Sequence, residues 1–282
     1  MTLRSLALVL VVAALAAGNS GAAPASLAAS PKWSNAEARA FARSLFVRSP
    51  YRIGREALAG VIEYRIALAP GAAWTWPETG EQRVRRDGDV KVLRICADCG
   101  REAAPDAAAM RQYLTANAWV TSDDPAVRHF ATAHAFGTNT HARMHALVKA
   151  VRARMNGPYD YRTYDSARIA LVTRRGDCTE FAVLLAATAR AIGIPARVAY
   201  GVAYSSRFAE GAHVFTPHMW VQAWDGTRWK SYDAGLETFD AGHIAVFVGD
   251  GAPRPAAGVT AVIRRLRLLE TAQIRTAPAT AR

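Results

Sequence analysis

Apolar residues recur at helical spacing in the segment that follows Gly176. The positions with this spacing are Phe181, Leu184, Leu185, Thr188 and Ile192. Gly193 and Pro195 then form a stop signal, because glycine suits a left-handed helix end and proline cannot continue a helix. The pattern predicts a helix that begins at Cys178 and ends before Gly193, followed by a strand over about 196–203.

Two segments rich in aromatic and β-branched residues, 218–224 and 227–233, are separated by Asp225-Gly226. An Asp-Gly pair between such runs is typical of a two-residue hairpin turn. That turn would place His218 directly opposite Asp233, with β-carbons about 4.5–5.5 Å apart on one face. A slip of one residue would place the two side chains on opposite faces of the sheet.

The rest of the chain alternates between the two patterns, and no internal repeat interrupts it. The expected elements are a mostly helical lead-in over 26–57, a strand over 61–68, a hairpin over 81–96 about Asp87-Gly88, helices over 106–121, 124–136 and 140–155, and strands over 243–248 and 259–269. This mixture of helices with antiparallel strands predicts the α+β fold class.

The N-terminus has the pattern of an export signal. Arg4 precedes an apolar run from Leu6 to Ala17, and small residues with Ala23-Pro24-Ala25 follow. This pattern predicts a signal peptide over residues 1–25 and a periplasmic or secreted mature protein without a membrane span. An uncleaved membrane anchor is the alternative.

The chain has 282 residues, of which 35 are Lys or Arg and 23 are Asp or Glu, for a formal charge of +12. Such a balance attracts anionic surroundings, and in an exported protein it favours a peptide, protein or envelope polymer as partner. A basic surface that only keeps the protein soluble is the plainer interpretation. The sequence has no zinc-finger, helix-turn-helix or RNA-recognition signature, so no specific nucleic-acid partner is expected. It gives no indication of the oligomeric state.

Of the three cysteines, Cys96 and Cys99 form a close pair. In an oxidising compartment this pair is expected to form a short disulfide, although a zinc site or a redox pair would use the same residues. Cys178 is then the odd cysteine and a candidate free thiol.

Cys178 stands where a helix is expected to begin. Asp177 is a good N-cap residue, and Glu180 completes a capping box. A helix N-terminus lowers the pKa of a nearby thiol, which predicts a reactive thiolate; a small apolar residue packed at a helix start is the alternative. With His218 and Asp233, the thiol completes the three parts of an activated cysteine nucleophile.

These motifs, in this order, resemble the transglutaminase-like superfamily. The similarity rests on Gly-Asp-Cys before an apolar helix, on the segment 191–198, on the His-Met-Trp-Val strand and on the strand that ends in Asp. The sequence is most similar to bacterial transglutaminase-like cysteine peptidases, which are related to papain in architecture. The resemblance implies that Cys178 is the nucleophile, His218 the general base and acid, and Asp233 the orienting carboxylate. It also implies a core in which the cysteine-bearing helix packs on an antiparallel sheet.

The expected activity is hydrolysis of a peptide or amide bond through a thioester, without a metal or organic cofactor. The Cys178 backbone N–H would hold the oxyanion, with Tyr161 and Tyr164 as candidates for a second donor. Acyl transfer to an amine, which cross-links proteins, would use the same residues. An inactive envelope-binding module and a zinc- or polyanion-binding structural protein are further alternatives.

The domain organisation expected from these assignments has four parts. They are the signal peptide (1–25), an N-terminal β-rich region (26–105), the transglutaminase-like catalytic domain (106–270) and a flexible tail (271–282). Other chemistry-bearing residues are expected to be structural, namely Arg197, His141, His145 and His243. His213 could compete with His218 as the base, but it lies in a Gly-rich stretch that resembles a loop.

Overall fold

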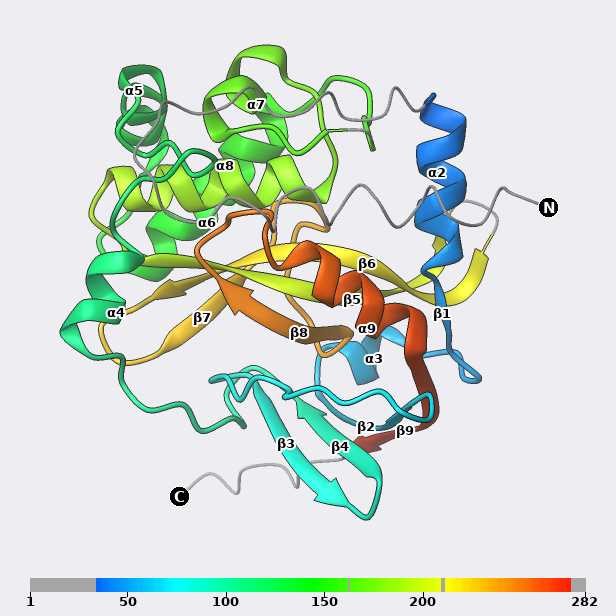
Figure 1. The fold of residues 1–282 in the computed structure, drawn as a ribbon. Coiled ribbons are helices and arrows are strands. Elements are labelled where there is room, and N and C mark those ends of the chain that lie inside the picture. The colour runs from blue at the N-terminus through cyan, green and yellow to red at the C-terminus, as the bar shows by residue number, and fades with distance from the viewer. Residues whose placement is uncertain (1–33, 162, 209–210, 275–282) are drawn as a thin grey trace, which may run out of the picture.

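The computed structural model describes residues 34–161, 163–208 and 211–274, so the predicted signal peptide lies outside the described residues. The helices are α2 (Asn35–Ser44), α3 (Arg55–Leu58), α4 (Ala107–Gln112), α5 (Pro125–His134), α6 (Thr140–Arg154), α7 (Ala167–Thr173), α8 (Cys178–Ala191) and α9 (Ala256–Arg265). The strands are β1 (Val47–Arg48), β2 (Val61–Leu68), β3 (Gln82–Asp87), β4 (Val90–Ile95), β5 (Ala196–Phe208), β6 (Gly211–Trp224), β7 (Trp229–Tyr232), β8 (His243–Gly249) and β9 (Leu266–Ile274). The predicted α+β class is confirmed (Figure 1).

A central antiparallel sheet carries the predicted chemistry. Its strand order is β1-β6-β5-β8, and β7 pairs with β6. Helix α8 packs against β5 and β6, and every residue from Glu180 to Arg190 is buried because α5, α6 and α7 surround the helix on its other sides. The predicted helix is confirmed, and it is buried on more sides than the single apolar stripe after Cys178 indicates. Figure 1 shows these helices on one side of the central sheet and the second sheet on the other.

The second sheet contains strands from the early part of the described chain and also its last strand, β9. Its order is β3-β4-β2-β9, so the C-terminal strand pairs with a strand of the predicted N-terminal region. Strand β9 pairs through Ile274, which lies opposite Val61. The prediction of a flexible tail from residue 271 is therefore wrong for 271–274, which form part of the sheet.

The expected strand over 259–269 is wrong in its first half. Residues up to Arg265 form helix α9, whose buried side chains are Val259, Val262 and Ile263. Intervals of three and one residues between these positions fit the period of a helix and not the period of two of a strand. The β-branched composition of the segment favoured a strand, but packing against β5 and β8 decides for the helix.

The expected helix over 106–121 is also much shorter in the structure, where α4 ends at Gln112. The Asn117 side chain accepts hydrogen bonds from the backbone N–H groups of Trp119 (2.9 Å) and Val120 (2.8 Å). Such local bonds offer the backbone an alternative to the helix. In contrast, β2 and the β3–β4 hairpin about Asp87-Gly88 are confirmed.

A disulfide and an ion pair anchor the segment between β4 and α4. Cys96 and Cys99 form the expected disulfide directly after β4. Arg197 donates to the Glu102 carboxylate from both terminal guanidinium nitrogens, Nη1 and Nη2. Its guanidinium carbon lies 4.3 Å from the centre of the Trp229 ring, so its expected structural role is confirmed. Within the described residues, no helix combines the length and the apolar character that crossing a membrane requires.

Candidate active site

Cys178 is the first residue of α8, and a capping box fixes that helix start. The Asp177 carboxylate accepts from the Thr179 N–H (2.9 Å), and the Glu180 carboxylate accepts from the Asp177 N–H (2.9 Å). Gly176 has φ 144°, and a β-carbon there would lie 2.5 Å from the Glu180 side chain, so glycine allows the close approach. The predicted capping box is confirmed.

The predicted register of the β6–β7 hairpin is wrong by two residues. Trp224 pairs with Trp229 instead of Thr227, because the connection is a four-residue loop rather than a two-residue turn. Asp225 forms that loop by accepting backbone hydrogen bonds from Thr227 (2.8 Å) and Arg228 (2.8 Å). A shift of two residues keeps every side chain on its face of the sheet, so His218 and Asp233 become diagonal neighbours instead of directly opposed ones.

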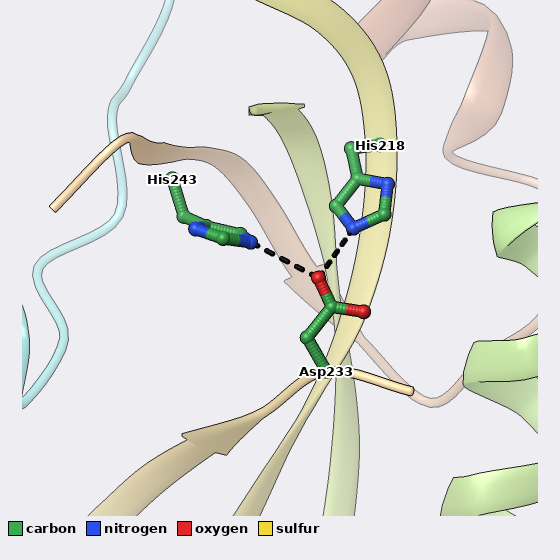
Figure 2. A group of neighbouring side chains, drawn as sticks. All are labelled: His218, Asp233 and His243. Carbon is green, nitrogen blue, oxygen red and sulfur yellow. Dashed lines mark hydrogen bonds and ion pairs between the residues drawn. The ribbon is translucent and has the colours of Figure 1, made fainter. Parts of the chain in front are cut away.

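Asp233 lies at the centre of a His–Asp–His cluster (Figure 2). Its Oδ2 accepts from His218 Nε2 at 2.6 Å and from His243 Nε2 at 3.0 Å. Its Oδ1 accepts from the backbone N–H groups of Gly235 (2.7 Å) and Leu236 (3.1 Å). Burial alone would raise the pKa of Asp233, but the charges and hydrogen bonds of the two histidines outweigh it and hold that pKa well below its usual range.

His243 is charged in this cluster. Its Nε2 faces Asp233 Oδ2 at 3.0 Å and its Nδ1 faces Asp240 Oδ1 at 3.0 Å, so a carboxylate oxygen lies at each ring nitrogen, which favours the imidazolium. Burial lowers the pKa of His243, but the two carboxylates overcome burial and raise it to about 9. His243 thus supplies a positive charge beside Asp233.

The charge on His243 makes stability depend on pH. The pKa of His243 rises from about 6.5 in the unfolded chain to about 9, so its contribution is complete below about pH 6.5 and is lost as the pH rises through 9. At about 1.4 kcal/mol per pKa unit, we expect up to about 3 kcal/mol less free energy of unfolding at pH 9.5 than at pH 6 from this group. Urea unfolding at several pH values measures this change in the free energy of unfolding.

The variant His243→Gln isolates that contribution, because Glu81 and Glu180 also have pKa values raised by burial, to about 7 and about 9, and also lower the stability as pH rises. The difference in unfolding free energy between wild type and His243→Gln should be large at pH 6 and should shrink toward pH 9.5. A difference that stays constant over this range would show that His243 is neutral in the folded protein.

Cys178 and His218 both lie beside Gly235. A β-carbon built on Gly235 would lie 3.2 Å from His218 Cε1 and 3.9 Å from Cys178 Cβ. Cys178, His218 and Gly235 all line one cavity of about 300 Å³, which we name the Cys178 cavity. Since His218 Nε2 is bound to Asp233, Nδ1 is the ring nitrogen that remains for another contact.

The expectation that the helix terminus alone produces a thiolate is contradicted. Burial raises the pKa of the Cys178 thiol well above its ordinary value, and Asp177 and Glu180 raise it further, whereas a hydrogen bond from the Met219 N–H lowers it. The acidic residues of the capping box thus oppose the effect of the helix N-terminus. The raised pKa favours the protonated thiol at rest, so a role as nucleophile would require a base.

Of the other predicted candidates, Tyr161 lies at the cavity, whereas Tyr164 and His213 make structural contacts. Tyr161 lines the Cys178 cavity, whereas the Tyr164 hydroxyl is bound to the Tyr200 hydroxyl (3.2 Å) and donates to the Gly251 carbonyl (3.0 Å). Tyr164 is therefore a structural residue. His213 is in strand β6 rather than in a loop, with φ 52°, and is bound to the Tyr204 hydroxyl at 3.0 Å, away from Asp233.

From the sequence, His243 was assigned only a structural role and Arg152 was not identified, although both contact the site. His243 carries no local signal of its contact with Asp233, because β5 and β6 separate β8 from β7 in the sheet. Arg152 on α6 donates to the carbonyls of Ala234 (3.0 Å) and Gly235 (2.9 Å) and so holds the loop after Asp233. By contrast, His141 is bound to the Tyr232 hydroxyl at 3.0 Å, as expected of a packing residue.

Within the described residues, His218, Asp233 and His243 are also a group that could hold a metal ion, because one ligand atom of each lies within 4.8 Å of the others. Their present contacts satisfy these atoms without a metal, since each imidazole donates to Asp233 Oδ2. The arrangement therefore suits a proton-transferring histidine oriented by a carboxylate.

Comparison with protein families gives a match for residues 128–234, which fit the family model described as the transglutaminase-like superfamily. The chain carries a transglutaminase-like core. This core includes Cys178, His218 and Asp233, and it ends before His243. The resemblance inferred from the sequence is thereby confirmed, and α2 and α9 lie outside the matched segment.

Several solved structures are similar to this chain at low identity. A proposed cysteine protease from Cytophaga hutchinsonii is 15% identical, with 77% of this chain and 90% of that chain covered and a TM-score of 0.47. The periplasmic domain of TgpA from Pseudomonas aeruginosa, bound to ethylmercury, is 19% identical, with 71% and 95% covered and a TM-score of 0.46. Red sea bream transglutaminase is 10% identical, with 64% and 47% covered and a TM-score of 0.35. A search of the curated proteins finds no match.

Proposed function

We propose that this protein is an exported thiol enzyme that hydrolyses a peptide or amide bond. The observation that carries the proposal is the position of His218, which is hydrogen-bonded to a buried carboxylate and lies, like Cys178, next to Gly235 in the lining of the Cys178 cavity. A thiol at a cavity, with an oriented imidazole, is the arrangement that nucleophilic catalysis requires. Asp233, with its low pKa, stays ionised and keeps the imidazole in one orientation.

In the proposed reaction, His218 Nδ1 takes the proton of the Cys178 thiol as sulfur attacks the substrate carbonyl carbon. The Cys178 backbone N–H at the start of α8 stabilises the oxyanion, and Tyr161 is placed to assist. The C–N bond then breaks, and the amine leaves with the proton from His218. Water attacks the thioester and gives its proton to His218, which releases a carboxylic acid and restores the thiol.

Export is supported by the Cys96–Cys99 disulfide, since such bonds persist in oxidising compartments and are rare in the cytosol. The N-terminal sequence, with Arg4 before an apolar run, points the same way. Its partners are proposed to be peptides, proteins or envelope polymers, and the charge of +12 would favour anionic ones.

The proposed thiol chemistry predicts a specific alkylation pattern. Because the Cys178 thiol is protonated at rest and depends on His218, we expect iodoacetamide to label Cys178 at a rate that falls at least about tenfold in His218→Ala at pH 7. Mass spectrometry of tryptic peptides identifies the labelled cysteine. Equal rates in the two proteins across pH 6 to 9 would favour an inactive binding module.

Hydrolysis and acyl transfer differ only in the group that reaches the thioester. Incubation of a glutamine-containing peptide with and without a labelled primary amine separates them, because hydrolysis gives the free acid and transfer gives a labelled peptide. We expect the free acid to dominate at millimolar amine. Labelled product in excess would favour the cross-linking alternative, which uses the same residues.

A further inference from the structure

The Cys178 cavity extends well beyond the residues of the proposed chemistry. Its far walls come from α2 and α9, which lie outside the matched segment 128–234, and from the end of β5. The large apolar side chains of these walls are Phe41, Leu45, Phe46, Phe208, Val259 and Ile263. Phe46 and Phe208 are packed edge to face, with ring centres 5.7 Å apart, which ties the chain after α2 to β5.

No described residue that lines the Cys178 cavity is a lysine, arginine or glutamate. The charged or titratable side chains of its lining besides the tyrosines are Asp177, Cys178 and His218, and these belong to the helix cap and the candidate site. A charged substrate group placed between α2 and α9 would therefore lose its water without gaining an oppositely charged partner from those walls. Such unpaired burial costs several kcal/mol for a polar group and more for a charge.

The mouth of the cavity is apolar as well. Tyr159 is 59% exposed and Leu236 is 46% exposed, and both line the cavity while most other large apolar side chains of the described chain are covered. Tyr159 stacks on Tyr161 with ring centres 6.2 Å apart. Exposed apolar side chains around a hollow are typical of a binding site for an apolar ligand.

From these observations we propose that the cavity between α2 and α9 is a specificity pocket for one large apolar side chain of a peptide substrate, adjacent to the carbonyl that Cys178 attacks. This proposal rests on the proposed function, because it names the substrate class of the same site. A volume of about 300 Å³ is at the lower end for ligand sites and suits one large side chain with its backbone rather than a long polymer segment.

The test compares amide substrates that share one chromogenic amine and differ in the residue that supplies the carbonyl, namely Phe, Leu, Ala, Glu and Lys. We expect kcat/KM to be at least about tenfold higher for Phe and Leu than for Ala, and lowest for Glu and Lys. The variant Ala42→Phe adds a ring to the lining from α2 and should remove the preference for Phe over Ala. Equal rates on all five substrates would overturn the proposal.

A second variant places a charge in the pocket. Thr260 on α9 lines the Cys178 cavity and is half-buried, whereas the neighbouring Ala261 is exposed and does not line it. Thr260→Asp is expected to reduce kcat/KM for Phe at least about tenfold, and Ala261→Asp should leave it unchanged. If both variants lost activity equally, the effect would be one of folding or net charge and the pocket assignment would fail.

Alkylation of the thiol separates this proposal from the proposed function. N-alkyl iodoacetamides form a thioether with Cys178 and release iodide and a proton, without any amide hydrolysis. If the pocket is correct, the alkylation rate should rise at least about fivefold from N-methyl to N-hexyl iodoacetamide in wild type and stay flat in Ala42→Phe. If the alkylation rate rises with the length of the alkyl group but no amide is hydrolysed, the proposed function is rejected and the pocket is retained. If amides are hydrolysed but the alkylation rates are equal along the series, only the pocket is rejected.

Discussion

Replacing Cys178 with alanine is expected to reduce amide hydrolysis below detection. Loss of the nucleophile in triad enzymes lowers kcat by about 10⁴-fold to 10⁶-fold, because the oriented base is left without a group to activate. The change should not disturb the fold, since it leaves the capping box of Asp177 and Glu180 in place. Initial rates on the preferred amide substrate, with thermal unfolding in parallel, measure both effects.

A matched control replaces the other two cysteines. The double variant Cys96→Ser/Cys99→Ser removes the disulfide after β4, which is not part of the Cys178 cavity, and should retain most of kcat while lowering the stability. Retention of a tenth or more of the wild-type rate in Cys178→Ala would contradict the thiol mechanism. The serine variant of Cys178 should also be nearly inactive, because a hydroxyl is a far weaker nucleophile at neutral pH.

The transglutaminase-like core was predictable because its signals are local. The helix start at Cys178 follows from Asp177, Glu180 and the apolar period that comes after them, and the structure has this capping box. The strands that carry His218 and Asp233 follow from their composition. The register between them was predicted wrongly, because the Asp225 side chain closes a four-residue loop. His218 and Asp233 still share one face of the sheet, because the register error is two residues and side chains alternate between faces.

The parts that were missed depend on contacts between distant segments. His243 reaches Asp233 because β8 lies beside β5 on the same sheet, and nothing in its own neighbourhood of sequence indicates this. Helix α9 was mistaken for a strand because its β-branched residues favour strands, whereas packing on β5 and β8 selects the helix. The depressed thiol pKa was expected from the helix end alone, whereas burial and the two acidic cap residues act in the opposite direction.

The same dependence on tertiary contacts gives a large expected effect on stability at Gly201. Gly201 lies on β5 between His218 on β6 and Ala245 on β8, at a point where the β5–β8 register shifts. A β-carbon there would lie 2.0 Å from the carbonyl oxygen of Ile244 and 3.0 Å from its carbonyl carbon. Backbone atoms cannot move aside without separating β5 from β8, which also carries His243.

We therefore expect Gly201→Ala to lower the free energy of unfolding by about 3 kcal/mol or more, which corresponds to a fall in Tm of roughly 10 °C for a chain of this size. Gly54→Ala is the matched control, because Gly54 has φ −79° and a β-carbon there would meet nothing within 4 Å. Urea and thermal unfolding of the two variants beside wild type make the comparison. If Gly201→Ala unfolded within about 0.5 kcal/mol of Gly54→Ala, the close contact between β5 and β8 would be refuted, and with it the support that holds His243 against Asp233.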